Sequence, residues 1–212
     1  MARLTRYVCV VALVVTACQS SPASSANQAA TPPAAKSPGA LLVFTTWVPD
    51  AKVTIGPEPG YKPALSGLTG HDIQSAVQII DAAGTSWVVN ITFTSRGTNL
   101  FAKLTHDNVA ACPGDAATGA GSGCPQRHLA IWLDLTQADI DNWEDATYAA
   151  TVSRPYDLGC LTGRSSTAVC PKLISDPITL QEIDGGHLTM DAGFNQQGAT
   201  ALANAINSVS PA

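Results

Sequence analysis

Cysteine is the residue type in this chain whose spacing carries the clearest chemistry. Four cysteines form two pairs, and each pair encloses a short segment of turn-forming residues: Cys112 and Cys124 enclose PGDAATGAGSG, and Cys160 and Cys170 enclose LTGRSSTAV. Four cysteines allow three pairings, and the short enclosed segments favour the disulfides Cys112–Cys124 and Cys160–Cys170. Each would stabilise the fold by roughly 2–3 kcal/mol in the chain-entropy model.

The alternative chemistry for these four cysteines is a four-thiolate zinc site. Structural zinc sites usually contain close CxxC pairs, and this chain has none. An even number of cysteines in an exported chain is more typical of disulfides. We therefore expect disulfides and no metal at these positions.

A further cysteine, Cys18, ends an N-terminal segment with the features of a signal peptide. Arg3 and Arg6 precede an almost wholly apolar run over residues 8–15, which is too short to span a bilayer. The segment ends in VTAC (15–18), which resembles the lipobox of bacterial lipoproteins. We predict a lipoprotein signal peptide over residues 1–18, with acyl chains on the Cys18 thiol holding the protein at the membrane on its extracytoplasmic face. The alternatives are a plain secretory signal with an incidental cysteine, or an uncleaved anchor.

The composition after Cys18 changes sharply at about residue 40. Residues 19–40 contain Ala, Ser and Pro but no large apolar residue, which predicts a disordered tether. Residues 41–209 are enough for one domain with a single core. Loss of Arg3 and Arg6 with the signal would change the formal charge from −5 to −7. Because no basic run is present, nucleic acid is not an expected partner.

Motifs of catalysis and cofactor binding are missing from the sequence. It contains no GxSxG, HExxH or Walker loop, so we predict a protein that is not an enzyme and has no cofactor. The scattered histidines favour surface or hydrogen-bonded roles over a metal site: His71, His106, His128 and His187. An acidic run over residues 139–145 has Glu144 where a calcium loop needs Gly and Ala150 where it needs Glu. It is more typical of a solvated acidic helix face.

Two tryptophans flank the segment that contains this acidic run. Trp143 follows Ile140 by three residues, so both side chains could pack into the core. If exposed, Trp132 and Trp143 would be candidate binding anchors.

Hydrophobic periodicity indicates the elements that carry these residues. Strands are predicted at 41–48, 87–94, 129–133, 148–152, 178–183 and 187–190. Helices are predicted at 70–83, 96–109, 136–144 and 196–206, with caps at Thr69, Ser95 and Asn195. The pattern indicates an α+β fold, a mixed β-sheet with helices packed on one face and two disulfide-closed loop insertions. Helix 96–109 would link strands 87–94 and 129–133 as a parallel crossover.

The order of several segments resembles a known family, the periplasmic P1 head domain of SecD and SecDF, accessory proteins of the Sec preprotein translocase. The matching segments are LTGHDIQSA (68–76), WVVNITFTSRGTNLFAKLT (87–105), RHLAIWLD (127–134), LISDPI (173–178) and GGHLTMDAGFNQQGATALANAI (185–206). They cover about half of the chain after Cys18. The resemblance implies a head-like fold over residues 41–209 and contact with exported polypeptide.

The chain also departs from this family. Residues 111–126 and 135–171 have no family counterpart, and each segment contains one cysteine pair. The membrane helices and intramembrane charges that couple export to proton flow are absent from the sequence. The resemblance therefore carries over a fold and not the motor activity, because a fold alone does not establish a function.

These observations predict a membrane-tethered extracytoplasmic interaction module, related to the SecD head, that contacts exported or envelope proteins. The alternative is a lipid or small-molecule carrier, which would need an apolar pocket of roughly 300 Å³ beneath the helices. A third class, an envelope hydrolase, would require residues such as His187 and Asp191 to converge in a cleft.

Overall fold

The computed structural model describes residues 41–54, 58–113, 123–161 and 168–209. The predicted lipidation site Cys18 and the predicted tether at 19–40 lie outside these residues. Among the residues that are described, no helix combines the length and apolarity needed to cross a membrane.

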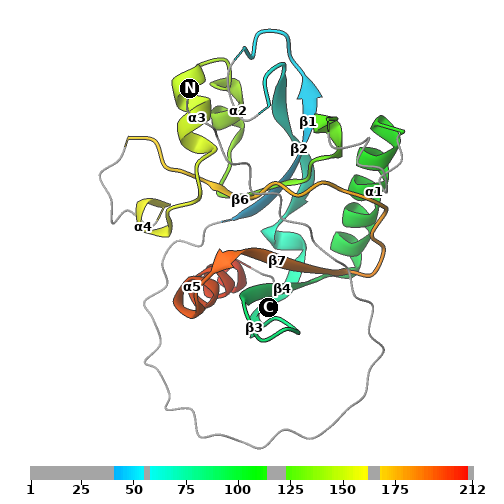
Figure 1. Ribbon diagram of the computed structural model, residues 1–212, viewed down its shortest axis with the longest axis vertical. Helices are drawn as coiled ribbons and strands as arrows, with labels where there is room; N and C mark the ends of the chain where they lie inside the picture. The colour runs from blue at the N-terminus through cyan, green and yellow to red at the C-terminus, as the bar shows by residue number, and fades with distance from the viewer. Residues whose placement is uncertain (1–40, 55–57, 114–122, 162–167, 210–212) are drawn as a thin grey trace, which may run out of the picture. The chain divides into compact units, whose positions relative to one another are not determined.

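The described strands form two sheets, separated in the ribbon view (Figure 1). The first sheet has the order β2-β1-β5-β6, with β1 at Leu42–Pro49, β2 at Tyr61–Thr69, β5 at Ala130–Leu133 and β6 at Leu173–Ser175. The second has the order β3-β4-β7, with β3 at Ile73–Ile80, β4 at Trp87–Phe93 and β7 at His187–Phe194. All pairs of named strands are antiparallel.

Helices connect and cover these sheets (Figure 1). The α-helices are α1 at Ser95–Ala111, α2 at Gln137–Asp141, α3 at Ala146–Val152, α4 at Leu158–Leu161 and α5 at Gln196–Asn207. Two 3-10 turns, η1 at Gly70–Asp72 and η3 at Pro125–Arg127, lead into β3 and β5. Thr94 rather than Ser95 caps α1, because its hydroxyl accepts a hydrogen bond from Gly97 N.

The first sheet is buried on both faces, which explains the continuous apolar run of β5. Leu42 and Phe44 of β1 enter a large core with α1, α5 and the second sheet. The alternate residues Val43 and Trp47 enter a smaller core on the other face, together with residues of α2 and α3. A strand covered on both faces needs apolar residues at every position rather than at alternate ones.

The predicted α+β class, with two disulfide-closed insertions, is confirmed. Cys112 pairs with Cys124 and Cys160 with Cys170, at Cα separations of 6.4 Å and 5.7 Å. The residues at 114–122 and 162–167, inside these loops, lie outside the described part of the chain.

The predicted parallel crossover is wrong. Strands β4 and β5 belong to different sheets, and the parallel pairing recorded in the structure is an isolated bridge between Pro155 and Leu173. Helix α1 therefore connects the two sheets instead of returning to the sheet it left.

The predicted helix at 70–83 is also wrong, because residues 73–80 form strand β3. The strand registers shift between Ile73 and Ser75, where β3 is irregular opposite β4. Here β3 contains one residue more than β4, so its side chains no longer alternate strictly between the two faces of the sheet. The buried residues Ile73 and Ala76 are consequently three positions apart, which imitates helical spacing.

Three smaller predictions differ from the structure. Residues 148–152 belong to helix α3, whose N-terminus is capped by the Asp145 carboxylate. Residues 178–183 form no strand and make an isolated bridge from Ile178 to His128. The prolines and glycines of residues 49–63 favour a loop there, but strand β2 already begins at Tyr61. It is an edge strand, where Pro63 is tolerated.

Candidate functional site

Strand β3 forms an outer edge of the second sheet and carries three exposed large apolar side chains, more than any other described strand. Val77, Ile79 and Ile80 are 51%, 38% and 49% exposed. The strand sequence, IQSAVQII, has no charged residue. An exposed, apolar and uncharged edge strand is a template for pairing with another extended chain.

The free edge of β3 is partly occupied by one side chain. The Asn207 carboxamide at the end of α5 accepts a hydrogen bond from Ala76 N and donates one to Ala76 O, both at 2.8 Å. Backbone groups of alternate residues point to the same edge of a strand. Gln78 and Ile80 therefore direct their backbone groups to the edge where Asn207 binds Ala76.

Other sheet edges carry features that oppose pairing. Strand β2 contains Lys62 and Pro63, and proline cannot donate a backbone hydrogen bond. Strand β7 contains Asp191 and ends near Gly193, which adopts a left-handed backbone with φ of +68°. Charged residues, prolines and local irregularities commonly protect a sheet edge from pairing with another chain. Strand β3 has neither a charged residue nor a proline.

On the face of the second sheet opposite α5, polar side chains of β4 and β7 lie next to the exposed Val77. Thr189 Oγ1 donates to Asn90 Oδ1 at 2.7 Å, and Thr92 Oγ1 lies 3.3 Å from His187 Nδ1. Asp191 instead accepts a hydrogen bond from Gly193 N. His187 and Asp191 thus have separate partners along an extended strand, and the structure does not bring them together as a hydrolase pair.

A second cluster brings together three residues that are distant in sequence: Glu58, His128 and Asp176. His128 Nδ1 lies 3.1 Å from Asp176 Oδ2 and 3.8 Å from Glu58 Oε1. Burial alone would lower the pKa of His128, but the hydrogen bond to Asp176 and the charges of Asp176 and Glu58 outweigh it and raise that pKa above its ordinary value. No spacing in the sequence could have indicated this convergence.

The other three histidines have separate surroundings. His106 pairs with Glu182 on the surface, His187 contacts Thr92, and His71 is exposed. The prediction of surface or hydrogen-bonded roles therefore describes these three, whereas His128 lies in a cluster with carboxylates.

Trp132 and Trp143 are buried, so the exposure that would make them candidate binding anchors is not present. They are 0% and 1% exposed, and their rings pack edge-to-face against each other at 5.6 Å and against Trp47 at 6.3 Å and 6.0 Å. These rings fill the smaller core, because the first sheet needs a cover on that face.

The acidic run at 139–145 is not a uniformly solvated helix face. Asp139 is 4% exposed and accepts hydrogen bonds from Lys172 Nζ at 2.7 Å and Tyr148 Oη at 2.6 Å. Burial opposes ionisation, but these bonds and those from Thr136 lower the pKa of Asp139 below its usual value. Asp145 caps α3, and Glu144 forms an exposed pair with Lys52.

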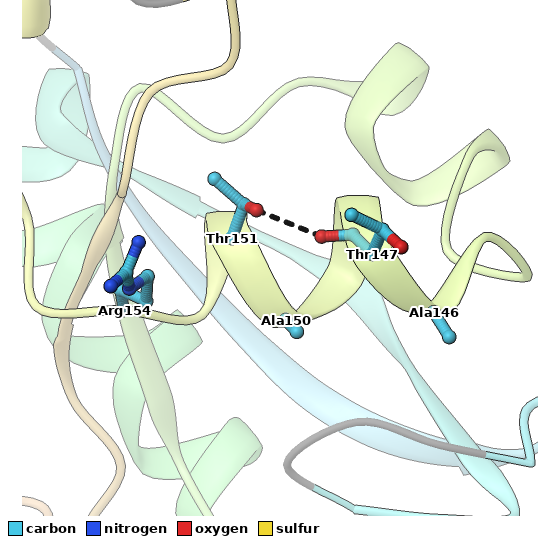
Figure 2. Close-up of a pocket in the computed structure, with 5 residues that line it drawn as sticks. All are labelled: Ala146, Thr147, Ala150, Thr151 and Arg154. Carbon is cyan, nitrogen blue, oxygen red and sulfur yellow. Dashed lines mark hydrogen bonds between the residues drawn. The ribbon is translucent and has the colours of Figure 1, made fainter.

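The hollows on the described surface include two that exceed roughly 300 Å³. One, of about 430 Å³, is lined by Ala146, Thr147, Ala150, Thr151 and Arg154. All five residues come from α3 or just after it, and Thr151 Oγ1 donates to Thr147 O within that helix (Figure 2). One short helix with small side chains cannot enclose a ligand. The other hollow, of about 360 Å³, lies between α1 and β1.

Comparison with known proteins identifies the family of this chain. The model of the SecDF P1 head subdomain matches residues 61–210. A solved structure of SecDF, described as a membrane component that enhances protein export, has 19% identity and a TM-score of 0.46, covering 80% of this chain and 63% of that chain. SecDF in a super-membrane-facing form has 19% identity and a TM-score of 0.45, covering 80% of this chain and 19% of that chain.

No curated protein matches the chain. The chain spans less than two thirds of the length of either SecDF structure. The SecDF head is an extracytoplasmic, membrane-associated domain. Because the matched residues make up more than half of the sequence, the chain belongs to the SecDF P1 head subdomain family.

Proposed function

We propose that this protein is a membrane-tethered extracytoplasmic interaction module that binds extended polypeptide segments along β3. The observation that carries this proposal is the uncharged outer edge of β3, with Val77 and Ile79 exposed beside it. Membership in the SecDF head family supports an exported or envelope polypeptide as the partner.

The edge supplies the two kinds of contact that strand addition needs. Outward backbone groups at Gln78 and Ile80 can hydrogen-bond to any extended chain, because every chain offers the same backbone donors and acceptors. The apolar side chains of Val77 and Ile79 can contact apolar residues of that chain. This combination suits polypeptides that have not yet folded and that share no particular sequence.

The proposal includes a lipid anchor at Cys18. Acylation would hold the domain at the membrane surface, and the Ala, Ser and Pro composition of residues 19–40 would make this segment a spacer. The parent chain should incorporate a labelled fatty acid in intact cells, and a Cys18→Ser variant should not. A parent chain that carries no fatty acid would contradict the anchor.

Site-specific photocrosslinking in intact cells tests the polypeptide interface. A crosslinking residue replaces Val77 in the full-length chain, and a matched control replaces Leu65, which is 45% exposed on edge strand β2. We expect position 77 to capture exported chains at several times the yield of position 65. Equal yields at the two positions would contradict binding at β3.

A second variant tests the role of the backbone. Gln78→Pro removes an outward N–H from β3 while leaving the side chains of Val77 and Ile79 in place. Capture at position 77 should fall severalfold, and an unchanged near-ultraviolet circular dichroism spectrum would show that the fold persists. Undiminished capture would contradict strand addition.

The carrier alternative has a candidate location in the hollow of about 360 Å³ between α1 and β1. Its lining includes Trp47, Leu100 and Leu104, together with Lys103 and Asp107 of the same helix. Mass spectrometry of lipids bound to the purified chain would test this alternative. A Leu100→Trp variant, which fills the hollow, should lose any lipid bound there and should leave capture at position 77 unchanged.

A further inference from the structure

Glu58, His128 and Asp176 converge from three separate parts of the chain. Glu58 lies in the β1–β2 connection, His128 follows η3, and Asp176 follows β6. One possible ligand atom from each residue lies within 4.8 Å of those of the other two. From this convergence we propose that the three residues bind a divalent transition-metal ion of the Zn²⁺ class.

The backbone around Glu58 holds it in a defined turn. Tyr61 N donates to Glu58 O at 3.1 Å across Pro59 and Gly60. Gly60 has φ of +85°, the left-handed conformation that a type II turn requires after proline. The turn therefore fixes the backbone position from which the Glu58 side chain extends.

Hydrogen bonds on both sides lock the segment of His128 to that of Asp176. Leu129 N donates to Pro177 O at 2.9 Å, and Thr179 N donates to Arg127 O at 2.7 Å. The Trp47 indole N–H donates to Asp176 Oδ1 at 3.3 Å, which leaves Asp176 Oδ2 facing His128. Such outer hydrogen bonds orient carboxylate ligands in metal sites.

Both carboxylates approach the same nitrogen of His128. Nδ1 lies 3.1 Å from Asp176 Oδ2 and 3.8 Å from Glu58 Oε1, and it carries at most one hydrogen. The 3.8 Å separation from Glu58 Oε1 is too long for a hydrogen bond. A metal ion would bind the nitrogen and both carboxylates at once.

Ligand chemistry, charge and access agree with this assignment. Imidazole and carboxylate are both zinc ligands, at distances of about 2.0–2.2 Å. Two carboxylates would balance a divalent charge when the imidazole is neutral. The side chains are 15–23% exposed, so an ion can enter and water can complete the coordination.

Calorimetric titration of the full-length, disulfide-intact protein with Zn²⁺, after treatment with a chelator, tests the site. We expect one high-affinity ion per chain, and a tenfold or greater loss of affinity in Glu58→Gln and in His128→Gln. The matched control is His106→Gln, which alters the exposed pair His106–Glu182 and should leave the affinity unchanged.

Two further readouts keep the result decisive. Glu58→Gln preserves side-chain size, so it remains informative if His128→Gln fails to fold. X-ray absorption of the zinc-loaded protein should show nitrogen and oxygen ligands, including one imidazole, and no sulfur. Absence of stoichiometric binding, or equal affinity in the parent chain and Glu58→Gln, would overturn the assignment. The proposed metal site does not depend on polypeptide binding at β3.

Discussion

Gly97 packs directly against the backbone of Asp72. A Cβ atom at position 97 would lie 2.2 Å from Asp72 O, far inside van der Waals contact. Asp72 is 1% exposed, and its carboxylate binds Thr69 N and the guanidinium of Arg96. The absence of a side chain at Gly97 thus allows the first turn of α1 to approach the turn η1 that precedes β3.

The first prediction concerns this close approach. Gly97→Ala should lower the free energy of unfolding by about 1–3 kcal/mol, because the added methyl must displace backbone. Urea denaturation monitored by tryptophan fluorescence measures the change. Gly185→Ala is the control, since a Cβ there meets nothing within 4 Å. Equal stability of the two variants would show that α1 can shift freely.

The second prediction concerns the Asn207 carboxamide on Ala76. Asn207→Ala should lower the free energy of unfolding by about 1 kcal/mol, because two hydrogen bonds at a partly exposed edge are lost. It should also increase self-association, because more of the β3 edge becomes available. Sedimentation velocity at several concentrations measures this, with Asn204→Ala, an exposed position on the same helix, as the control.

The third prediction is a pH dependence at Asp139. The pKa of this carboxyl is lowered in the folded protein, so its interactions stabilise the fold above pH 3.8 and are lost as the pH falls through the folded-state pKa. At pH 7, Asp139→Asn should cost about 2–3 kcal/mol by leaving the Lys172 ammonium without its carboxylate partner. The difference between parent and variant should shrink below pH 3.8. A constant difference from pH 7 to pH 2 would contradict this origin.

A fourth prediction follows for Tyr148, whose hydroxyl donates to Asp139. Burial, followed by the hydrogen bond to the Asp139 carboxylate, raises the pKa of Tyr148 to about 12. The phenol therefore favours the folded state below pH 10, and this contribution is lost as the pH rises through 12. Ultraviolet titration of the parent chain and Tyr148→Phe should assign the late-ionising tyrosine. In Asp139→Asn, which lacks the anionic acceptor, Tyr148 should ionise at lower pH.

The fifth prediction concerns the disulfides. Protein from its native compartment, denatured without reductant, should show no free thiol at the four paired positions. Replacing Cys160 and Cys170 together with serine should lower stability by about 2–3 kcal/mol, since this bridge closes a loop of sequence separation 10. The pair Cys112 and Cys124, with separation 12, should behave similarly. Four titratable thiols would contradict an oxidising location.

Elements with strong local signals could be predicted from the amino-acid sequence alone. Strands β1, β4 and β5 follow from β-branched and aromatic runs, and α5 follows from the Asn195 cap and the spacing of Ala199, Leu202 and Ile206. The disulfide pairing was also predictable, because two cysteines close in sequence can meet without help from the fold. The order of the family segments predicted the SecDF head relationship.

Features that depend on contacts between distant residues could not be predicted in this way. The irregularity between Ile73 and Ser75 gave β3 a helix-like spacing, and pairing with β4 overrode that pattern. Trp143 is buried because the first sheet must be covered on its second face. Glu58 and Asp176 meet His128 because hydrogen bonds of the folded backbone bring their segments together. Local periodicity reports which face of an element is apolar, whereas the partner of that face is set by packing over the whole chain.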